Sequence, residues 1–351
     1  MEVPSIFLNN ILREGAKKKA RSIYLTVGSA PVLRIKNNLI SFKEEILNED
    51  QLDKVIQSFL NKEERDELIK NKEIVVVKSF LDNYRFRINI FYQKSFPSIT
   101  FHLISQEVKN LSDLGLPRPF QELLNYNSGL LVLTGPNNSG KTTTVTSVIE
   151  KINKEEDKYI ITLERPIEYI FSNKKSIVNQ RQLGVDVNTY EEGLLNCLEE
   201  DVDVVYVGEL REEFESAIPY VMELAAGNCL VILEMDTEYS VRAIEKILSA
   251  LQKSRNKEAA SYFLADVLIG VLSQKLIKNK EQGLSLALEL LLVNTAVKSL
   301  IRENNIYQIN NIIQNHMSEG MINMSKSVAN LINDGLVDPI EVEKLNFSTE
   351  V

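Results

Sequence analysis

A glycine-rich loop between an apolar strand and a helix carries the clearest chemistry in this 351-residue chain. It fits G-x-x-x-x-G-K-T, with Thr143 directly after it, and its residues are Gly135, Pro136, Asn137, Asn138, Ser139, Gly140, Lys141 and Thr142. In such a P-loop, backbone N–H groups bind phosphate oxygens and the lysine reaches the terminal phosphates, while the Thr142 hydroxyl can ligate Mg²⁺. The pattern predicts a nucleoside triphosphate site.

Two more apolar strands are predicted to end in charged residues. The run at 204–207 precedes Glu209 and Arg211, and the run at 159–163 precedes Glu164. Ligands bind at the carboxyl ends of strands in open α/β sheets. A carboxylate there can orient the water that attacks the γ-phosphate, or help to hold Mg²⁺. A solvent-exposed glutamate is the simpler interpretation of Glu209, but the P-loop favours the functional one.

Composition limits the class of protein. The net charge is -9, which argues against a general nucleic-acid binder, and only two cysteines occur. No apolar run approaches the length of about 18 residues that spans a bilayer. We therefore expect a cytoplasmic enzyme without disulfides, structural zinc or direct membrane insertion.

The pattern of elements divides the chain near residue 115. Residues 1–115 predict an α+β domain with helices at 4–19 and 50–70 and alternating strands after each. Residues 116–351 predict an α/β domain, because short apolar strands alternate with helices as in a parallel sheet buried on both faces. From about 259 onward we expect a mainly helical region, interrupted by one strand at 284–292.

Motifs along almost the whole chain resemble the retraction ATPases of type IV pili, the PilT family of secretion and pilus motors. The family's G-P-T-G-S-G-K-S/T-T-T matches the P-loop, and its I-T-I-E-D-P-I-E acidic box matches 161–168. Q-R-E-V-G resembles 180–184, and R-E-D-P-D-V-I-L-V-G-E-M-R resembles the segment ending at Arg211. R-F-R-V-N matches 85–89, and A-I-R-N-L-I-R-E resembles 296–303.

The resemblance implies a PAS-like N-terminal domain followed by a RecA-like ATPase domain, with ATP and Mg²⁺ as cofactors. It implies that Glu209 is the catalytic glutamate and that Glu164 is the first carboxylate of the acidic box. Arg85 and Arg87 match arginines that reach the phosphates when the cleft between domains closes; an exposed strand residue is the alternative for Arg85. The implied partners are further copies in a homo-hexamer, an inner-membrane pilus platform protein and a second pilus motor ATPase, at the inner face of the membrane.

Departures from the family pattern leave other functions open. Arg165 replaces the second carboxylate of the acidic box, and Asp236 replaces the histidine of G-T-L-H-T-N-S-A, which aligns with 233–240. An active retraction motor is favoured because Lys141 and Glu209 are both present. A slow or inactive paralogue that binds ATP and regulates an active motor is the first alternative, and a pilus extension or secretion ATPase is the second.

Overall fold

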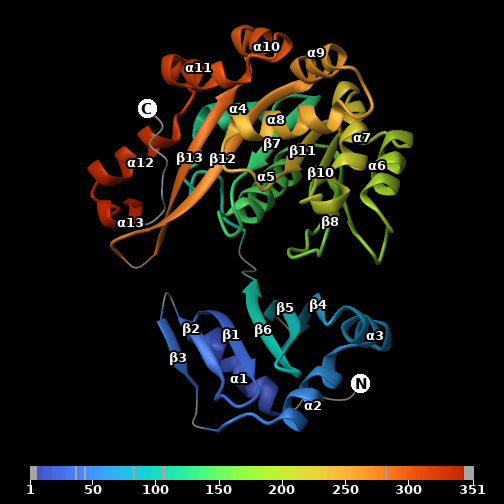
Figure 1. Cartoon of the computed structure of the whole chain (residues 1–351), viewed down its shortest axis with the longest axis vertical. Coiled ribbons are helices and arrows are strands. Elements are labelled where there is room, and N and C mark those ends of the chain that lie inside the picture. Colours follow the sequence, from blue (N-terminus) through green and yellow to red (C-terminus); the bar gives the residue numbers. More distant parts are fainter. Residues whose placement is uncertain are drawn as a thin grey trace. The chain divides into compact units, whose positions relative to one another are not determined.

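The computed structural model describes residues 6–35, 38–42, 45–81, 84–104, 108–281 and 283–343, and the chain forms two compact units (Figure 1). Unit 1 comprises Met1–Glu107 and the separate segment Pro166–Tyr169; unit 2 comprises Val108–Arg165 and Ile170–Val351. The first break lies a few residues before the division proposed near 115. The segment at 166–169 was not anticipated.

Unit 1 contains one six-stranded sheet, with neighbouring strands antiparallel, in the order β3-β2-β1-β6-β5-β4. Its helices pack against the buried side of this sheet and complete one core. The elements are α1 (Ile6–Lys17), β1 (Ala20–Thr26), β2 (Val32–Ile35), β3 (Asn38–Ser41), α2 (Glu49–Phe59), α3 (Lys62–Asn71), β4 (Glu73–Phe80), β5 (Tyr84–Gln93) and β6 (Phe96–Ile104).

The helix predicted at 50–70 is two helices. Asn61 begins α3: its side chain accepts from the N–H of Glu64, and the Glu64 side chain accepts from the N–H of Asn61. This reciprocal capping box satisfies two backbone donors that a helix start leaves without partners. The chain therefore breaks between Phe59 and Lys62 although no proline or glycine lies there.

Unit 2 is built on a seven-stranded sheet in the order β13-β12-β7-β11-β10-β8-β9, in which only the β12–β13 pair is antiparallel. Its elements are α4 (Arg118–Leu123), β7 (Gly129–Thr134), α5 (Lys141–Glu155), β8 (Tyr159–Glu164), β9 (Ile177–Gln182), α6 (Tyr190–Glu199), β10 (Val204–Val207), η1 (Arg211–Glu213), α7 (Phe214–Ala226), β11 (Leu230–Glu234), α8 (Ser240–Leu251), α9 (Lys257–Val267), β12 (Leu268–Lys278), β13 (Leu284–Leu292), α10 (Thr295–Arg302), η2 (Ile306–Gln308), α11 (Ile309–Asn315), η3 (Met317–Glu319), α12 (Met324–Asn333) and α13 (Pro339–Glu343).

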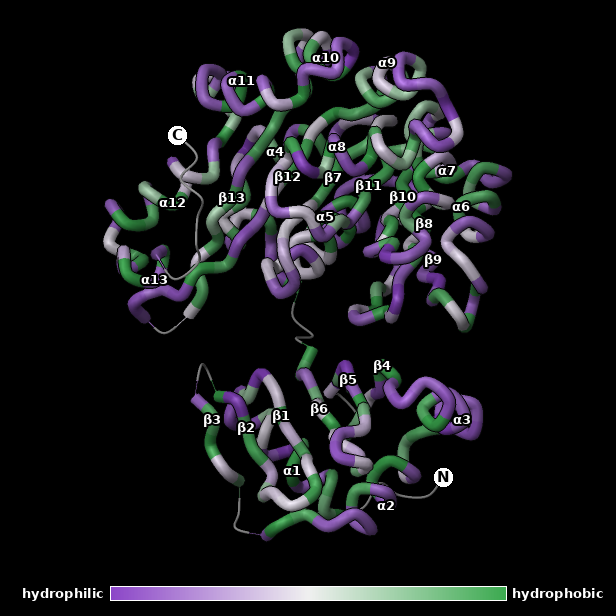
Figure 2. Tube along the Cα trace, in the orientation of Figure 1, coloured by the Kyte–Doolittle hydropathy of each residue, from purple (hydrophilic) through white to green (hydrophobic). Residues whose placement is uncertain are grey.

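Strand β7 shows how the sheet is covered on both faces. Leu130 and Val132 pack into a core shared with α6, α7, α8 and α9, whereas Leu131 and Leu133 pack into a second core with α4 and α5. Hydrophobic residues accordingly gather in the central strands of unit 2 (Figure 2). Burial on both faces explains why these strands are continuous apolar runs rather than alternating ones.

The expectation of a mainly helical region from 259 onward was wrong at 268–278. These residues form β12, which pairs with β7 on one side and β13 on the other, so two strands of the sheet lie inside the predicted helical region. The apolar run of β12 is compatible with either a buried helix or a buried strand, and the two neighbouring strands decide between them. None of the helices within the described residues is long and apolar enough to cross a membrane.

Candidate nucleotide-binding site

The P-loop joins β7, near the middle of the sheet, to the start of α5. Gly135 has φ of +150°, and a Cβ there would lie 2.3 Å from the carbonyl oxygen of Gln274, so only glycine fits. Asn138 occupies the left-handed region with φ of +64°, which asparagine tolerates better than most residues. The loop therefore adopts the tight path that its sequence predicts.

Lys141 and Ser139 show that the loop suits phosphate. The buried Lys141 Nζ donates to the carbonyl oxygens of Gly135 at 2.7 Å and Pro136 at 3.2 Å, so the ammonium group lies over the loop. Ser139 Oγ is buried without a hydrogen-bond partner among the described residues. A buried hydroxyl without a partner is costly, and a phosphate oxygen would satisfy it. Thr142 and Thr143 form the first turn of α5, at its positive dipole end.

Two predicted carboxylates come from neighbouring strands. Glu164 ends β8 and is buried; its Oε1 accepts from Thr162 Oγ1 at 2.6 Å and from Gln180 Nε2 at 3.1 Å. Glu209 lies two residues beyond β10, with its side chain 25% exposed. The Gly208 N–H donates to the carbonyl of Leu163 at 2.9 Å, which continues the β8–β10 pairing up to these two glutamates. The structure thus brings Glu164 and Glu209 to the same edge of the sheet.

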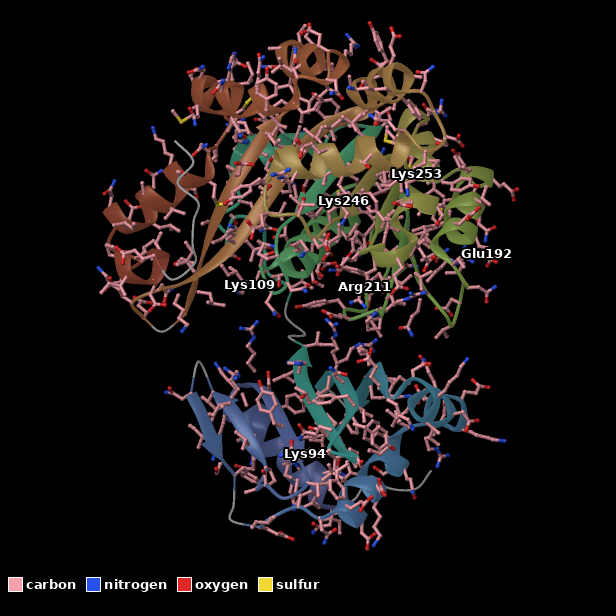
Figure 3. All side chains as sticks on the ribbon, in the orientation of Figure 1. Lys94, Lys109, Glu192, Arg211, Lys246 and Lys253 are labelled. Carbon is pink, nitrogen blue, oxygen red and sulfur yellow. The ribbon has the colours of Figure 1, made fainter. Side chains whose placement is uncertain are left out.

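Arg211 lies at the start of η1, in a strained turn. Its φ is +48°, a conformation that costs a non-glycine residue about 1–2 kcal/mol. The half-exposed side chain places Nε 3.8 Å from Glu209 Oε2 and extends from the turn after β10 (Figure 3). Strain of this kind collects at ligand sites, where the surrounding structure holds it in place.

Arg165 does not leave an unbalanced positive charge beside Glu164. Its Nη2 lies 3.2 Å from Glu213 Oε1, and Glu213 Oε2 accepts from the backbone N–H of Tyr190, the first residue of α6. Glu213 therefore neutralises Arg165 while it also satisfies a free donor at the start of a helix.

Arg85 and Arg87 lie on β5, and both contact the segment 166–169 of unit 1. Arg85 Nη2 donates to the carbonyl of Ile167 at 2.8 Å, and Arg87 Nη1 lies 3.1 Å from Glu168 Oε1. Arg85 is partly buried and makes a specific contact, and its role at the phosphates stays a prediction.

Sequence comparison places the chain in a family. The family model described as "Type II/IV secretion system protein" matches residues 6–286. The chain belongs to this type II/IV secretion system protein family. A twitching motility protein of Neisseria gonorrhoeae is 31% identical over 88% of this chain and 82% of its own length. The type IV pilus ATPase PilU of Pseudomonas aeruginosa is 24% identical over 93% of this chain and 85% of its own length.

A solved structure agrees with the family assignment across both units. The pilus retraction motor PilT with bound ADP superposes with a TM-score of 0.86, at 31% identity and with 97% of each chain covered. The predicted α/β fold is confirmed, and with it the resemblance to the PilT family. Together with the P-loop geometry, this similarity identifies the chain as a nucleotide-binding ATPase of the secretion family.

Asp236, which replaces the family histidine, is held by an ion pair. Its Oδ1 accepts from Lys246 Nζ at 2.7 Å, and Lys246 extends from α8 (Figure 3). This hydrogen bond holds the pKa of Asp236 below its ordinary value, so the residue is an anion at neutral pH. A group that stays charged cannot take up a proton as a histidine can near neutral pH.

Sequence reasoning missed a buried pair of polar residues, Glu234 and Tyr206, of which Glu234 lies beside the P-loop lysine. Glu234 ends β11 and is 8% exposed; its Oε1 lies 3.9 Å from Lys141 Nζ, and its Oε2 accepts from the hydroxyl of Tyr206 at 2.8 Å. Burial, and then the charge of Glu234, raises the pKa of Tyr206 well above its ordinary value, so the phenol remains a donor. Glu234 follows the same rule as Glu164, a carboxylate at the end of an apolar strand, and this rule could have found it.

Proposed function

We propose that this chain is the ATP-hydrolysing motor that powers retraction of a type IV pilus. The observation that carries the proposal is the convergence of three strand ends, since the P-loop after β7 and the glutamates after β8 and β10 lie on one edge of one sheet. The similarity to the solved PilT motor supports the biological role.

Hydrolysis needs a bound triphosphate and an oriented water. Backbone N–H groups from Gly135 to Thr143 would bind the phosphates, with Lys141 at the β- and γ-phosphates and Arg211 beside them. Glu209, partly exposed at the sheet edge, would orient the attacking water, and Glu164 would support it from β8. Mg²⁺ held through the Thr142 hydroxyl would neutralise charge on the phosphate oxygens.

The proposed motor is an assembly of identical chains. We place Arg85 and Arg87 as groups that reach the phosphates of a nucleotide when the two units close, in a ring of six identical chains. A guanidinium in that role stabilises the charge of the transition state and accounts for roughly 10³–10⁵ in rate in other NTPases. The ring would act in the cytoplasm on a pilus platform protein of the inner membrane, beside a second motor ATPase.

Phosphate release from Mg-ATP tests the enzymatic half of the proposal. Wild type should turn over, whereas Lys141→Ala should lose ATP binding, because it removes the charge that contacts the phosphates. Glu209→Gln should keep ATP binding but lose about 10²–10⁴ in rate. Glu122→Gln, in an exposed pair with Arg118, is the matched control and should behave as wild type. Near-zero turnover in wild type and Glu209→Gln alike, with ATP bound to both, would instead favour the regulatory paralogue.

Twitching motility tests the retraction half. A bacterium that lacks its retraction motor should regain twitching when it expresses the wild-type chain, and should not regain it with Glu209→Gln. Phosphate release without restored twitching would favour an extension or secretion ATPase.

A further inference from the structure

Glu234 is a buried acidic residue at the position where a nucleotide would bring its own negative charge. Its carboxylate is 3.9 Å from the ammonium of Lys141, and both side chains are nearly buried, at 10% and 5% exposure. The pairing partner of Glu234 across the sheet is Leu133, the next-to-last residue of the strand that leads into the P-loop.

Tyr206 holds the carboxylate in place. It lies on β10, beside β11 in the sheet, and donates its hydroxyl hydrogen to Glu234 Oε2 at 2.8 Å. Because this hydrogen bond satisfies one oxygen, the carboxylate faces Lys141 with the other. Tyr206 itself is buried, so little water can reach its hydroxyl in place of this contact.

The charges around Lys141 compete with one another. In the described structure Lys141 donates to two loop carbonyls and lies beside Glu234. A phosphate that takes over this ammonium must break those contacts and approach a fixed negative charge. In a buried site such repulsion is weakly screened and acts over several ångströms.

We propose that Glu234 is an internal competitor for the nucleotide phosphates: it stabilises Lys141 in the empty P-loop and thereby weakens nucleotide binding and favours product release. Glu234 is a positioning residue that acts through Lys141. The inference rests on the nucleotide site, and it holds whether or not the motor retracts a pilus.

Variants that remove the Glu234 carboxylate and a variant that removes its Tyr206 donor should shift ADP affinity in opposite directions. Glu234→Gln keeps the shape and an acceptor for Tyr206 but removes the charge, so ADP should bind about tenfold tighter or more, because one unit of negative charge no longer repels it. Glu234→Thr also removes the charge and should shift ADP affinity in the same direction. Tyr206→Phe removes the donor that shares the carboxylate, so Glu234 should hold Lys141 more strongly and ADP should bind more weakly.

Titration of the full-length chain with ADP, and separately with tripolyphosphate, is the test. Tripolyphosphate carries negative charge but no nucleoside, so Glu234→Gln should bind both ADP and tripolyphosphate more tightly than wild type does. Glu289→Gln removes a similarly buried carboxylate that accepts from the Ser240 N–H, and it should leave both affinities unchanged. Thermal melting supplies a second measurement: ADP should raise the melting temperature of Glu234→Gln more than that of wild type, because the variant leaves Lys141 without its ion pair to Glu234 until phosphate arrives.

Each other result overturns the inference. Unchanged or weaker ADP binding by a folded Glu234→Gln variant would show that the carboxylate does not compete with phosphate. If the Glu234→Gln variant bound ADP more weakly only in the presence of Mg²⁺, Glu234 would be assigned to metal binding instead. If Glu234→Gln and Tyr206→Phe shifted the affinity for ADP in the same direction, the two residues would have a packing role. Failure of wild type itself to bind ADP would remove the nucleotide site, and the inference with it, whereas bound ADP without ATP turnover would count only against the proposed function.

Discussion

Arg165 lies 3.2 Å from Glu213, and this ion pair accounts for the charge reversal in the acidic box. The family pattern has a carboxylate at this position, so an unpaired arginine would repel Mg²⁺ near Glu164. Glu213 comes from η1, directly before α7. Its side chain also accepts a hydrogen bond from the backbone N–H of Tyr190, the first residue of α6. The replacement at 165 is therefore matched by a partner already fixed in the fold.

Substitution of Arg165 by aspartate should change turnover by less than about twofold, because Glu213 already neutralises the wild-type charge. The variant should lose about 0.5–1 kcal/mol of unfolding free energy, since the pair is partly exposed and two carboxylates would then face each other. Phosphate release and urea unfolding measure the two effects. Glu213→Gln is the companion variant, and it should lower turnover more than Arg165→Asp because it leaves the arginine unbalanced. A tenfold rise in turnover in Arg165→Asp would contradict this account.

Alanine at Gly135 should abolish nucleotide binding and cost about 1–3 kcal/mol of stability, because its Cβ would overlap the Gln274 carbonyl. Gly184→Ala is the control that measures backbone strain without a clash. The φ of Gly184 is +80°, but a Cβ there would have no atom within 4 Å. Gly184→Ala should therefore cost only the strain of about 1–2 kcal/mol and keep nucleotide affinity. Denaturant unfolding and ADP titration of both variants provide the comparison. Equal losses of ADP affinity would show that loop crowding is not the cause.

The buried carboxyl of Glu289 should make stability depend on pH. Burial raises its pKa above the ordinary value in the folded protein. The folded state therefore holds this proton more tightly than the unfolded chain, and the site gains stability as pH falls through the folded pKa towards about 4.3. Glu289→Gln lacks this gain, so it should exceed wild type in stability at pH 7 and lose that advantage on acidification. Urea unfolding at several pH values checks this, and an advantage that grows as pH falls would refute it.

Thr144 and Gln274 should be energetically coupled. Gln274 Nε2 donates to Thr144 Oγ1 at 2.8 Å, and both residues are buried. A double-mutant cycle with Thr144→Val and Gln274→Met should give a coupling of about 0.5–1.5 kcal/mol, the usual net value of one hydrogen bond. The same cycle with Thr144→Val and the distant, exposed Glu122→Gln should be additive within about 0.5 kcal/mol. Additivity in the first cycle would mean that the bond contributes nothing.

Most apolar strands could be predicted from the sequence, including β4 and β13 at sheet edges, whereas the edge strands β3 and β9 could not. The strand at 204–207 is buried on both faces, so its apolar run stands out. Strand β9, Ile177–Gln182, is mostly polar and lies at the end of the sheet, and all four residues of β3 are exposed at the edge of the other sheet. These two edge strands bury little apolar surface, so pairing with the neighbouring strand, which no local pattern records, decides their conformation.

The site could be predicted as far as its motifs extend. The P-loop and Glu209 follow from spacing and from strand ends, and the structure places them on one edge of the sheet. The partner of Arg165 could not be predicted, because Glu213 is 48 positions away in the chain and only the fold brings the two together. The contact between Glu234 and Lys141 likewise depends on the order of β7 and β11 in the sheet.

The hydrogen bond between Gln274 and Thr144 fastens the first turn of α5 to β12. That strand pairs with β13 from Gly270 to Lys278, and α12 packs against β13. A small displacement of α5 would therefore be resisted by the paired strands β12 and β13. If ATP is hydrolysed at the P-loop, as proposed, a movement of α5 would be passed through β12 and β13 to α12.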